Sequence, residues 1–226
     1  MLFRSLDFLM HYNGCAINIA NIDIQSFITA SIYCDELVNG QKRFTLNLVL
    51  DEKKSKQDWL DEMLIVCRGF KVYQNGKHGI IIDKPENVCQ VFDVQIDEDL
   101  EIEWADNNNL LEQVQLTYLD PTYKWAKVGA VAKVLPFLNR SPITKTVEIF
   151  GVTNFQQASQ LAYFYVNQAQ TCRTTYIYKT NQSAINRSVC DVVAINDPIL
   201  GVTNKKCRIM SISNRSEERR VGKEGP

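Results

Sequence analysis

Residues 151–172 read GVTNFQQASQLAYFYVNQAQTC, and this stretch decides the fold. Its pattern predicts a long amphipathic helix over residues 153–170. Thr153 is expected to cap the N-terminus, and Gln156 stands where a capping-box side chain reaches back to the cap. The side chains expected in the core share one helical face: Phe155, Ala158, Ala162, Tyr165, Val166 and Ala169. The polar side chains fall largely on the opposite face: Gln157, Gln160, Asn167 and Gln168.

The hydrophobic period changes after Cys172, and three short strands are predicted from there to Ser213. The first, over residues 173–180, is rich in Thr and Tyr, which are common in strands. The second, over residues 191–196, reads DVVAIN and precedes the turn pair Asp197-Pro198. The last strand is expected over residues 207–212. The helix and these strands form a packing unit in which no residue is placed for chemistry.

Three helices are predicted before residue 70. Leu2, Leu6, Leu9 and Met10 share a face of the first helix, which Asn13-Gly14 ends. The second helix follows Asp23 and ends at Asn39-Gly40, and its inner stripe is Phe27, Ala30, Ser31 and Cys34. Ser55 caps the third helix, which Gly69 ends, and its stripe is Leu60, Met63, Leu64 and Cys67.

One strand and two β-hairpins are predicted between residues 43 and 134. Residues 43–50 (RFTLNLVL) become continuously apolar, so the end of this strand is expected to be buried on both faces. Residues 70–73 and 79–82 form a hairpin around Asn75-Gly76, a strong turn signal. Residues 114–119 and 123–134 form a second hairpin around Asp120-Pro121, and Tyr123 and Trp125 are interpreted as cross-strand packing residues rather than a binding platform.

Length and composition indicate an ordinary soluble globular protein with one large domain or two small domains. The 226 residues are 45% hydrophobic and 23% charged, with a net charge of −1. This charge gives no global attraction to nucleic acid or to an anionic membrane. No apolar run approaches the roughly 18 residues of a membrane-spanning helix. Asp7 stands too early for the apolar core of a signal peptide, so synthesis in the cytoplasm is expected.

The residue types that carry chemistry are not grouped in the sequence. Seven cysteines lie at positions 15, 34, 67, 89, 172, 190 and 207 without a C-x-x-C pair, which favours reduced, buried thiols over disulfides. His11 and His78 lack paired ligand spacing, so zinc is disfavoured. The adjacent carboxylates Asp35 and Glu36 point about 100° apart on a helix and are interpreted as solvated charges.

Further alternatives concern calcium and catalytic motifs. The acidic residues at positions 97, 98, 99, 101 and 103 lack the glycine and ligand spacing of a calcium loop. Those at 101 and 103 alternate with apolar residues, as on the solvent face of a strand. The sequence contains no G-x-S-x-G, no phosphate-binding glycine loop and no H-E-x-x-H. We therefore expect no catalytic, cofactor-binding or metal-binding residue.

Two strings carry a family resemblance: EIFGVTNFQQASQLA over residues 148–162 and SVCDVVAINDP over residues 188–198. They resemble the tail tip attachment proteins of long-tailed phages, also called host-specificity protein J. ASIYCDELV over residues 30–38 and VQLTYLDPTYKW over residues 114–125 are similar to the same family. The sequence departs from it at Val189-Cys190, where the family usually has Pro-Gly. We expect a turn of a different type there, because the freedom of glycine at positive φ is lost.

The resemblance implies an α+β fold with a β-rich, tube-like tail-hub domain over residues 87–214. Residues 1–86 would form a small helix-strand-helix-hairpin unit attached to it. The implied function is structural, not enzymatic: a central hub at the virion tail tip, assembled in the host bacterial cytoplasm. Its implied partners are two further copies in a homotrimer, other tail-tip proteins and the tape measure protein.

The resemblance covers a central slice of the family's length. N-terminal hub domains, and the C-terminal parts through which the family meets a host surface receptor, are therefore expected to be missing. No cofactor and no specific nucleic-acid binding are implied. Two alternatives stay open: a tail-associated hydrolase, and a carbohydrate-binding module based on Tyr123 and Trp125.

Residues 215–224, RSEERRVGKE, match the conceptual translation of a common sequencing adapter. We therefore predict that residues 215–226 are dispensable, because they lack apolar periodicity to offset an ordering cost of about 1–2 kcal/mol per residue. Deleting them should leave the melting temperature (Tm) unchanged in a thermal unfolding scan. A fall of several degrees would count against the adapter interpretation.

Overall fold

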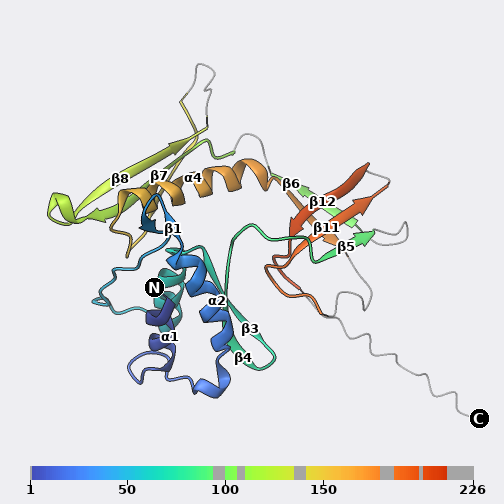
Figure 1. Cartoon of the computed structure of the whole chain (residues 1–226). Coiled ribbons are helices and arrows are strands. Elements are labelled where there is room, and N and C mark those ends of the chain that lie inside the picture. Colours follow the sequence, from blue (N-terminus) through green and yellow to red (C-terminus); the bar gives the residue numbers. More distant parts are fainter. Residues whose placement is uncertain are drawn as a thin grey trace, which may run out of the picture. The chain divides into compact units, whose positions relative to one another are not determined.

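The computed structural model describes residues 2–93, 100–105, 110–134, 141–178, 186–198 and 201–212 (Figure 1). Helices and several small sheets are combined, which confirms the α+β class. The contacts divide the chain into two compact units. The first comprises Met1–Lys84 and Leu100–Ile177, and the second comprises Pro85–Asp99 and Tyr178–Pro226. The division into domains at residues 86 and 87 stays a prediction, and so does the assignment of residues 215–226, which lie outside the described residues.

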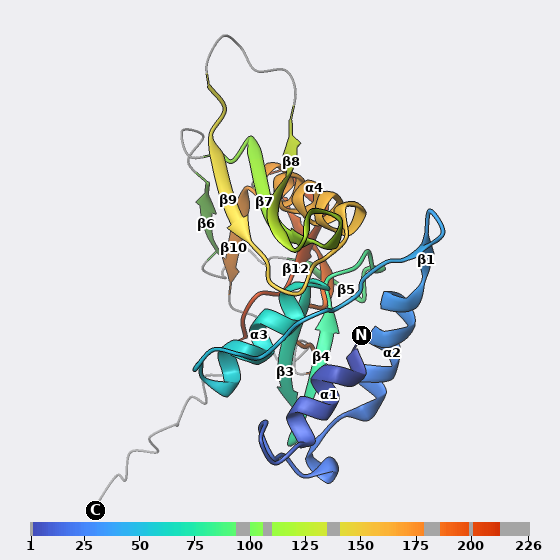
Figure 2. The same ribbon diagram turned by 90° about the vertical axis from the view of Figure 1, so that its left-hand side faces the viewer.

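The first unit contains three short helices and a β-hairpin from the N-terminal part of the chain (Figure 2). Their bounds are α1 (Leu2–Met10), α2 (Ile24–Asp35), α3 (Lys56–Ile65), β3 (Gly69–Gln74) and β4 (Lys77–Ile82). Ser55 caps α3 as predicted, and α2 begins after Asp23 as predicted, with Asp23 as its cap; each cap accepts a hydrogen bond from a backbone N–H of the first turn. The predicted inner stripes of these two helices are buried, and the hairpin turns at Asn75-Gly76 as predicted.

The segment after α2 differs from the prediction, because the helix ends at Asp35 rather than at Asn39-Gly40. A two-residue hairpin follows, with β1 (Leu37–Val38), β2 (Gln41–Lys42) and the Asn39-Gly40 pair as its turn. Both turn residues have positive φ, as a two-residue hairpin turn of this kind requires, so the pair connects two strands and does not end the helix. The short 3-10 helix η1 (Ile19–Asn21) precedes α2.

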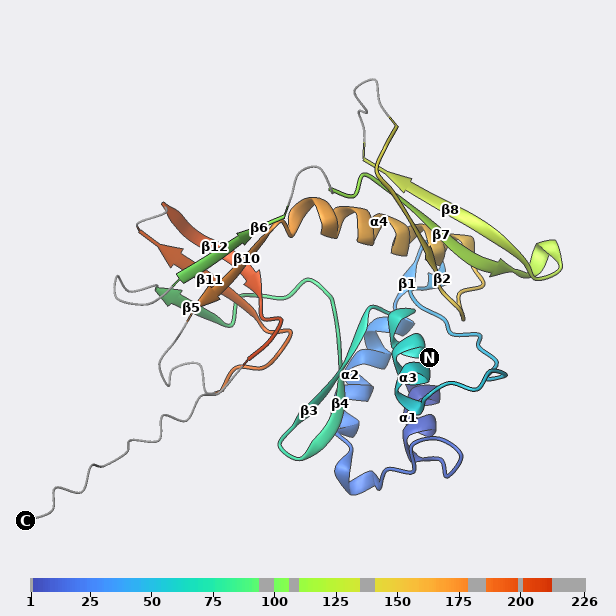
Figure 3. The ribbon, with the colours of Figure 1, turned by 180° about the vertical axis from the view of Figure 1, so that it is seen from behind.

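The first unit also contains a sheet with the strand order β8-β7-β9, covered by the long helix α4 (Figure 3). The bounds are β7 (Gln113–Asp120), β8 (Ala126–Lys133), β9 (Thr144–Glu148) and α4 (Phe155–Thr171). β7 is antiparallel to β8, as the second predicted hairpin requires, and parallel to β9. Ala130 and Ala132 of β8 and Ala158 and Ala162 of α4 are fully buried, so small side chains allow the helix to lie close to the sheet. β6 (Leu100–Trp104) pairs with β10 (Thr174–Tyr178) in a separate two-stranded sheet.

The buried arc of α4 is rotated relative to the predicted one. Asn154, not Thr153, caps the helix by accepting a hydrogen bond from the Gln156 N–H at 2.8 Å. Phe155 is 60% exposed, although it was predicted in the core, whereas Leu161 is 1% exposed. Gln157, predicted on the polar face, is only 3% exposed. The rotation arises because an extended segment from earlier in the chain packs against the first turns of α4.

That extended segment is residues 43–50, which were predicted to be a strand but join no sheet. The side-chain amide of Gln157 replaces a strand partner for Thr45: its Oε1 accepts the Thr45 N–H at 3.1 Å, and its Nε2 donates to the Thr45 carbonyl at 3.1 Å. Phe44 and Leu46 are buried as the backbone alternates, whereas Val49 is 76% exposed. The prediction that the end of this segment is buried on both faces is therefore wrong.

Two further contacts fix the same segment to the chain before α4. The Asn47 N–H donates to the Gly151 carbonyl at 3.0 Å, and Asn47 Nδ2 donates to Thr153 Oγ1 at 2.8 Å. Gly151 has a φ of +88°, and a Cβ at this position would lie 2.7 Å from Leu46 Cδ1. Glycine is favoured there, because a side chain would be strained at this φ and would displace the end of the Leu46 side chain.

The second unit contains a three-stranded sheet with the order β12-β11-β5. The bounds are β5 (Gln90–Asp93), β11 (Val192–Asp197) and β12 (Val202–Arg208). Phe92, Val193, Ala194 and Ile195 are buried. β12 starts five residues before the predicted start at Cys207. It is an edge strand, and its exposed residues include Asn204-Lys205-Lys206. These polar side chains hide the strand pattern in the sequence, which is why the prediction began too late.

The turn before β11 keeps the conformation that its sequence was expected to lose. Cys190 has a φ of +75° and is buried. Its N–H donates to the Ile209 carbonyl at 2.8 Å, and its carbonyl accepts from Arg208 Nη1 at 2.9 Å. Positive φ is therefore not lost with the glycine, because these two hydrogen bonds hold a non-glycine residue there, whereas the difference in turn type from the family stays a prediction.

We predict that Gln157→Ala lowers the free energy of unfolding by about 1–3 kcal/mol, because buried polar groups around Thr45 lose their partners. Gln157→Glu should also destabilise, since a carboxylate cannot donate to the Thr45 carbonyl. Urea unfolding measures the loss, and amide hydrogen exchange at Thr45 should speed up in both variants. Gln168→Ala, on the exposed face of the same helix, should stay within about 0.5 kcal/mol of the parent. Equal losses of unfolding free energy for Gln157→Ala and Gln168→Ala would contradict a stabilising role of the Gln157–Thr45 hydrogen bonds.

We also predict that Cys190→Gly is more stable than Cys190→Ala by about 1 kcal/mol, because only the alanine retains the strain of a positive φ. Both substitutions remove the same buried thiol, so the difference isolates the backbone conformation. Urea denaturation of the two variants measures it. An alanine variant as stable as the glycine variant would show that this position carries no strain.

Candidate functional site

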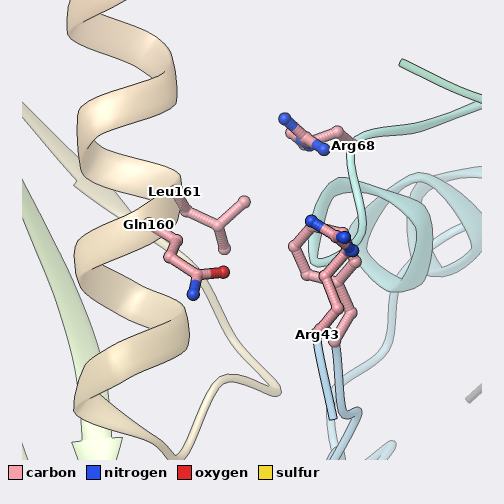
Figure 4. Close-up of a pocket in the computed structure, with 5 residues that line it drawn as sticks. Arg43, Arg68, Gln160 and Leu161 are labelled. Carbon is pink, nitrogen blue, oxygen red and sulfur yellow. The ribbon is translucent and has the colours of Figure 1, made fainter. Parts of the chain in front are cut away.

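A cavity of about 220 Å³ lies within the first unit, between the start of α4 and the segments that pack against it (Figure 4). Its lining residues are Arg43, Phe44, Arg68, Gln160 and Leu161. Gln160 and Leu161 come from α4, Arg43 and Phe44 follow β2, and Arg68 lies between α3 and β3. In Figure 4 the side chains of Arg43, Arg68 and Gln160 point toward one another.

Arg68 is held in place by its backbone and by aromatic side chains. It has a φ of +59°, and its carbonyl accepts the Asp83 N–H at 2.9 Å. The guanidinium carbon lies 4.5 Å from the ring centroid of Phe164 and 5.3 Å from that of Phe44. Nη2 donates to the Tyr33 hydroxyl at 2.9 Å. Stacking of this kind orients a guanidinium group without neutralising its charge.

Arg43 lies on the other side of the cavity. Its Nη2 donates to Glu36 Oε2 at 2.7 Å, and its guanidinium carbon lies 4.4 Å from the centroid of the Tyr33 ring. Tyr33 therefore contacts both arginines, one through its ring and one through its hydroxyl. Glu36, predicted to be a solvated charge, is exposed and forms this ion pair, and its neighbour Asp35 pairs with Lys42 at 2.8 Å.

The cavity is electropositive, because two guanidinium groups face it and Glu36 supplies one carboxylate. The Nε atoms of Arg43 and Arg68 are both buried without a hydrogen-bond partner in the part of the chain that the structure describes. Burial raises the pKa of Tyr165, and the positive charge of Arg68 opposes part of that shift. The phenol therefore stays neutral near pH 7 and supplies no negative charge.

The second feature is the tip of the β7–β8 hairpin, which presents two aromatic residues. The 3-10 helix η3 (Pro121–Tyr123) follows β7 and is capped by Asp120, whose Oδ1 accepts the Thr122 N–H at 2.8 Å. Burial, together with the hydrogen bond to Asp120, raises the pKa of Tyr118 to about 12. Tyr123 and Trp125 are 66% and 59% exposed. Both lie in the turn, so the interpretation of these residues as cross-strand packing residues is wrong.

The remaining candidates for chemistry do not converge. All seven cysteines are free thiols, but Cys89 and Cys172 are exposed, so the expectation of burial is wrong for these two. A hydrogen bond with Cys34, together with burial, raises the pKa of Cys67. His11 is exposed at the end of α1, and His78 pairs with Tyr73 across the β3–β4 hairpin.

A search of the described residues finds no group of three or more His, Cys, Asp or Glu side chains that could hold a metal ion. The acidic residues at positions 97–99 lie outside this part of the chain. Among the same described residues, no helix has the length and apolar character that crossing a membrane requires. The expectation of no catalytic, cofactor or metal residue stays a prediction.

Comparison with protein families identifies the chain. Residues 85–212 match the model of a family described as "Putative phage tail protein", and this range is more than half of the sequence. The chain belongs to this phage tail protein family. The match includes the second unit, the β7–β9 sheet and α4, whereas Arg43 and Arg68 precede it. A comparison with curated proteins finds no match.

Two solved structures have a similar fold. A chain in the virion of a native gene transfer agent particle matches with a TM-score of 0.67 and 14% identity, over 92% of this chain and 43% of its own length. A tail protein from Neisseria meningitidis MC58 matches with a TM-score of 0.51 and 13% identity, over 70% of this chain and 50% of its own length. At these identities the likeness concerns the fold alone. The chain spans half or less of each neighbour.

Proposed function

We propose that this phage tail protein is a structural component of the tail tip, where it forms part of the central hub. The observation that carries the proposal is the fold match over 92% of the chain to a protein of a virion particle. The family match over residues 85–212 supports the same class of function. The resemblance to tail tip attachment protein J adds the position at the tip.

The proposed hub is a homotrimer that encloses the tail lumen. In this arrangement it contacts other tail-tip proteins and the tape measure protein, and it reaches a host surface receptor through regions beyond this chain. A carbohydrate-binding module is the second candidate, because Tyr123 and Trp125 are both exposed in one turn.

We predict that gold-labelled antibodies against this chain bind tail particles of the encoding phage or prophage at the end distal to the capsid. Chemical cross-linking of the same particles should give a species that contains three copies, because a hub on the tail axis follows the threefold symmetry proposed for it. Preimmune serum is the control. Label along the shaft, label on the capsid, or particles without label would each contradict the hub.

A further inference from the structure

The cavity between Arg43 and Arg68 has an unbalanced set of charges and donors. A guanidinium group is always ionised and offers five N–H donors. Arg43 uses Nη2 for Glu36, and Arg68 uses Nη2 for the neutral hydroxyl of Tyr33. Both Nε atoms are buried and without an acceptor in the described chain. Within the same residues no carboxylate forms a salt bridge with Arg68. The cavity therefore has positive charge in excess, because two guanidinium groups line it and one carboxylate, Glu36, pairs with Arg43.

The two arginines are also oriented before any ligand arrives. Arg68 lies against the rings of Phe164 and Phe44, and Arg43 lies against the ring of Tyr33. Such contacts restrict the long side chains, so less conformational entropy is lost when a ligand binds. The planar guanidinium fork matches the two oxygens of a carboxylate or a phosphate, which it binds in pairs of parallel hydrogen bonds.

We propose that Arg43 and Arg68 form an oxyanion-binding site that takes a carboxylate or phosphate group beside Gln160. The cavity volume of about 220 Å³ is several times the roughly 30 Å³ that one water molecule occupies in the liquid, so such a group fits. The group has two sources: a free oxyanion, or an acidic side chain of a second protein chain that inserts into the cavity. The site stands on the contacts of the first unit and does not depend on the proposed hub function.

Gln160→Glu tests the site by placing a carboxylate inside the cavity. The substitution nearly keeps the size of the side chain, and Gln160 points at the two arginines (Figure 4). If the site binds an oxyanion, the new carboxylate occupies it and raises the Tm by about 2–4 °C, a shift typical of one added interaction in a chain of this size. The matched control is Gln168→Glu, which adds the same charge on the exposed face of α4 and should leave the Tm within about 1 °C.

Inorganic phosphate is the probe for a free oxyanion. Increasing phosphate, with sodium chloride adjusted to constant ionic strength, should raise the Tm of the parent chain along a saturating curve. The Gln168→Glu control should respond like the parent. Gln160→Glu should lose the response, because its own carboxylate fills the cavity.

The outcomes separate the two sources and can overturn the site. Stabilisation by Gln160→Glu with a phosphate response in the parent supports a free oxyanion. Stabilisation by Gln160→Glu without a phosphate response supports an acidic side chain of another chain. A fall in Tm for Gln160→Glu, equal shifts for the two Glu variants, or a phosphate response that survives Gln160→Glu would each overturn the proposal.

Discussion

The hydrogen bonds between Gln157 and Thr45 join the two parts of the chain that build the first unit. The side-chain amide of glutamine has an acceptor oxygen beside an NH2 donor, so it pairs with both the N–H and the C=O of an extended residue. Thr45 consequently needs no neighbouring strand, and the N–H groups of Phe44 and Asn47 donate to the Cys34 and Gly151 carbonyls instead. These hydrogen bonds fix Thr45 so that its neighbours Phe44 and Leu46 enter the core and Arg43 lies at the cavity beside α4. Gly151 makes the same junction possible by letting Leu46 approach the backbone.

The cavity shows how aromatic side chains stabilise two guanidinium charges, of which only that of Arg43 has a carboxylate partner, Glu36. Removing a guanidinium group from water is costly unless its charge and donors find partners. Tyr33, Phe44 and Phe164 supply ring faces to the two arginines, which is weaker than an ion pair but favourable at a partly dry site. The protein therefore stabilises the two guanidinium charges partly by stacking.

Elements with a complete local pattern were predictable from sequence, and contacts between distant segments were not. The cap at Ser55, the stripe of α2 and the Asn75-Gly76 turn depend on residues within a few positions of each other. Gln157 was assigned to the polar face because its partner Thr45 lies 112 residues earlier. Arg43 and Arg68 carry no motif, so the sequence does not indicate that they line one cavity. Phe155 and Val49 are apolar but exposed, because burial depends on which segment packs opposite.

The family match does not coincide with a structural unit, because residues outside it complete the core around α4. The match begins at residue 85, so it contains Gln157 and the buried face of α4 but none of residues 43–48. Thr45, Phe44 and Leu46 complete that face from outside the matched segment, and Leu161 lies in one core cluster with Leu46, Leu64 and Val66. The polar and apolar groups that α4 buries thus belong to contacts made by both parts of the chain. In physical terms, the N-terminal segment is an integral layer of the first unit, because removing it would leave Gln157 unpaired and one side of α4 uncovered.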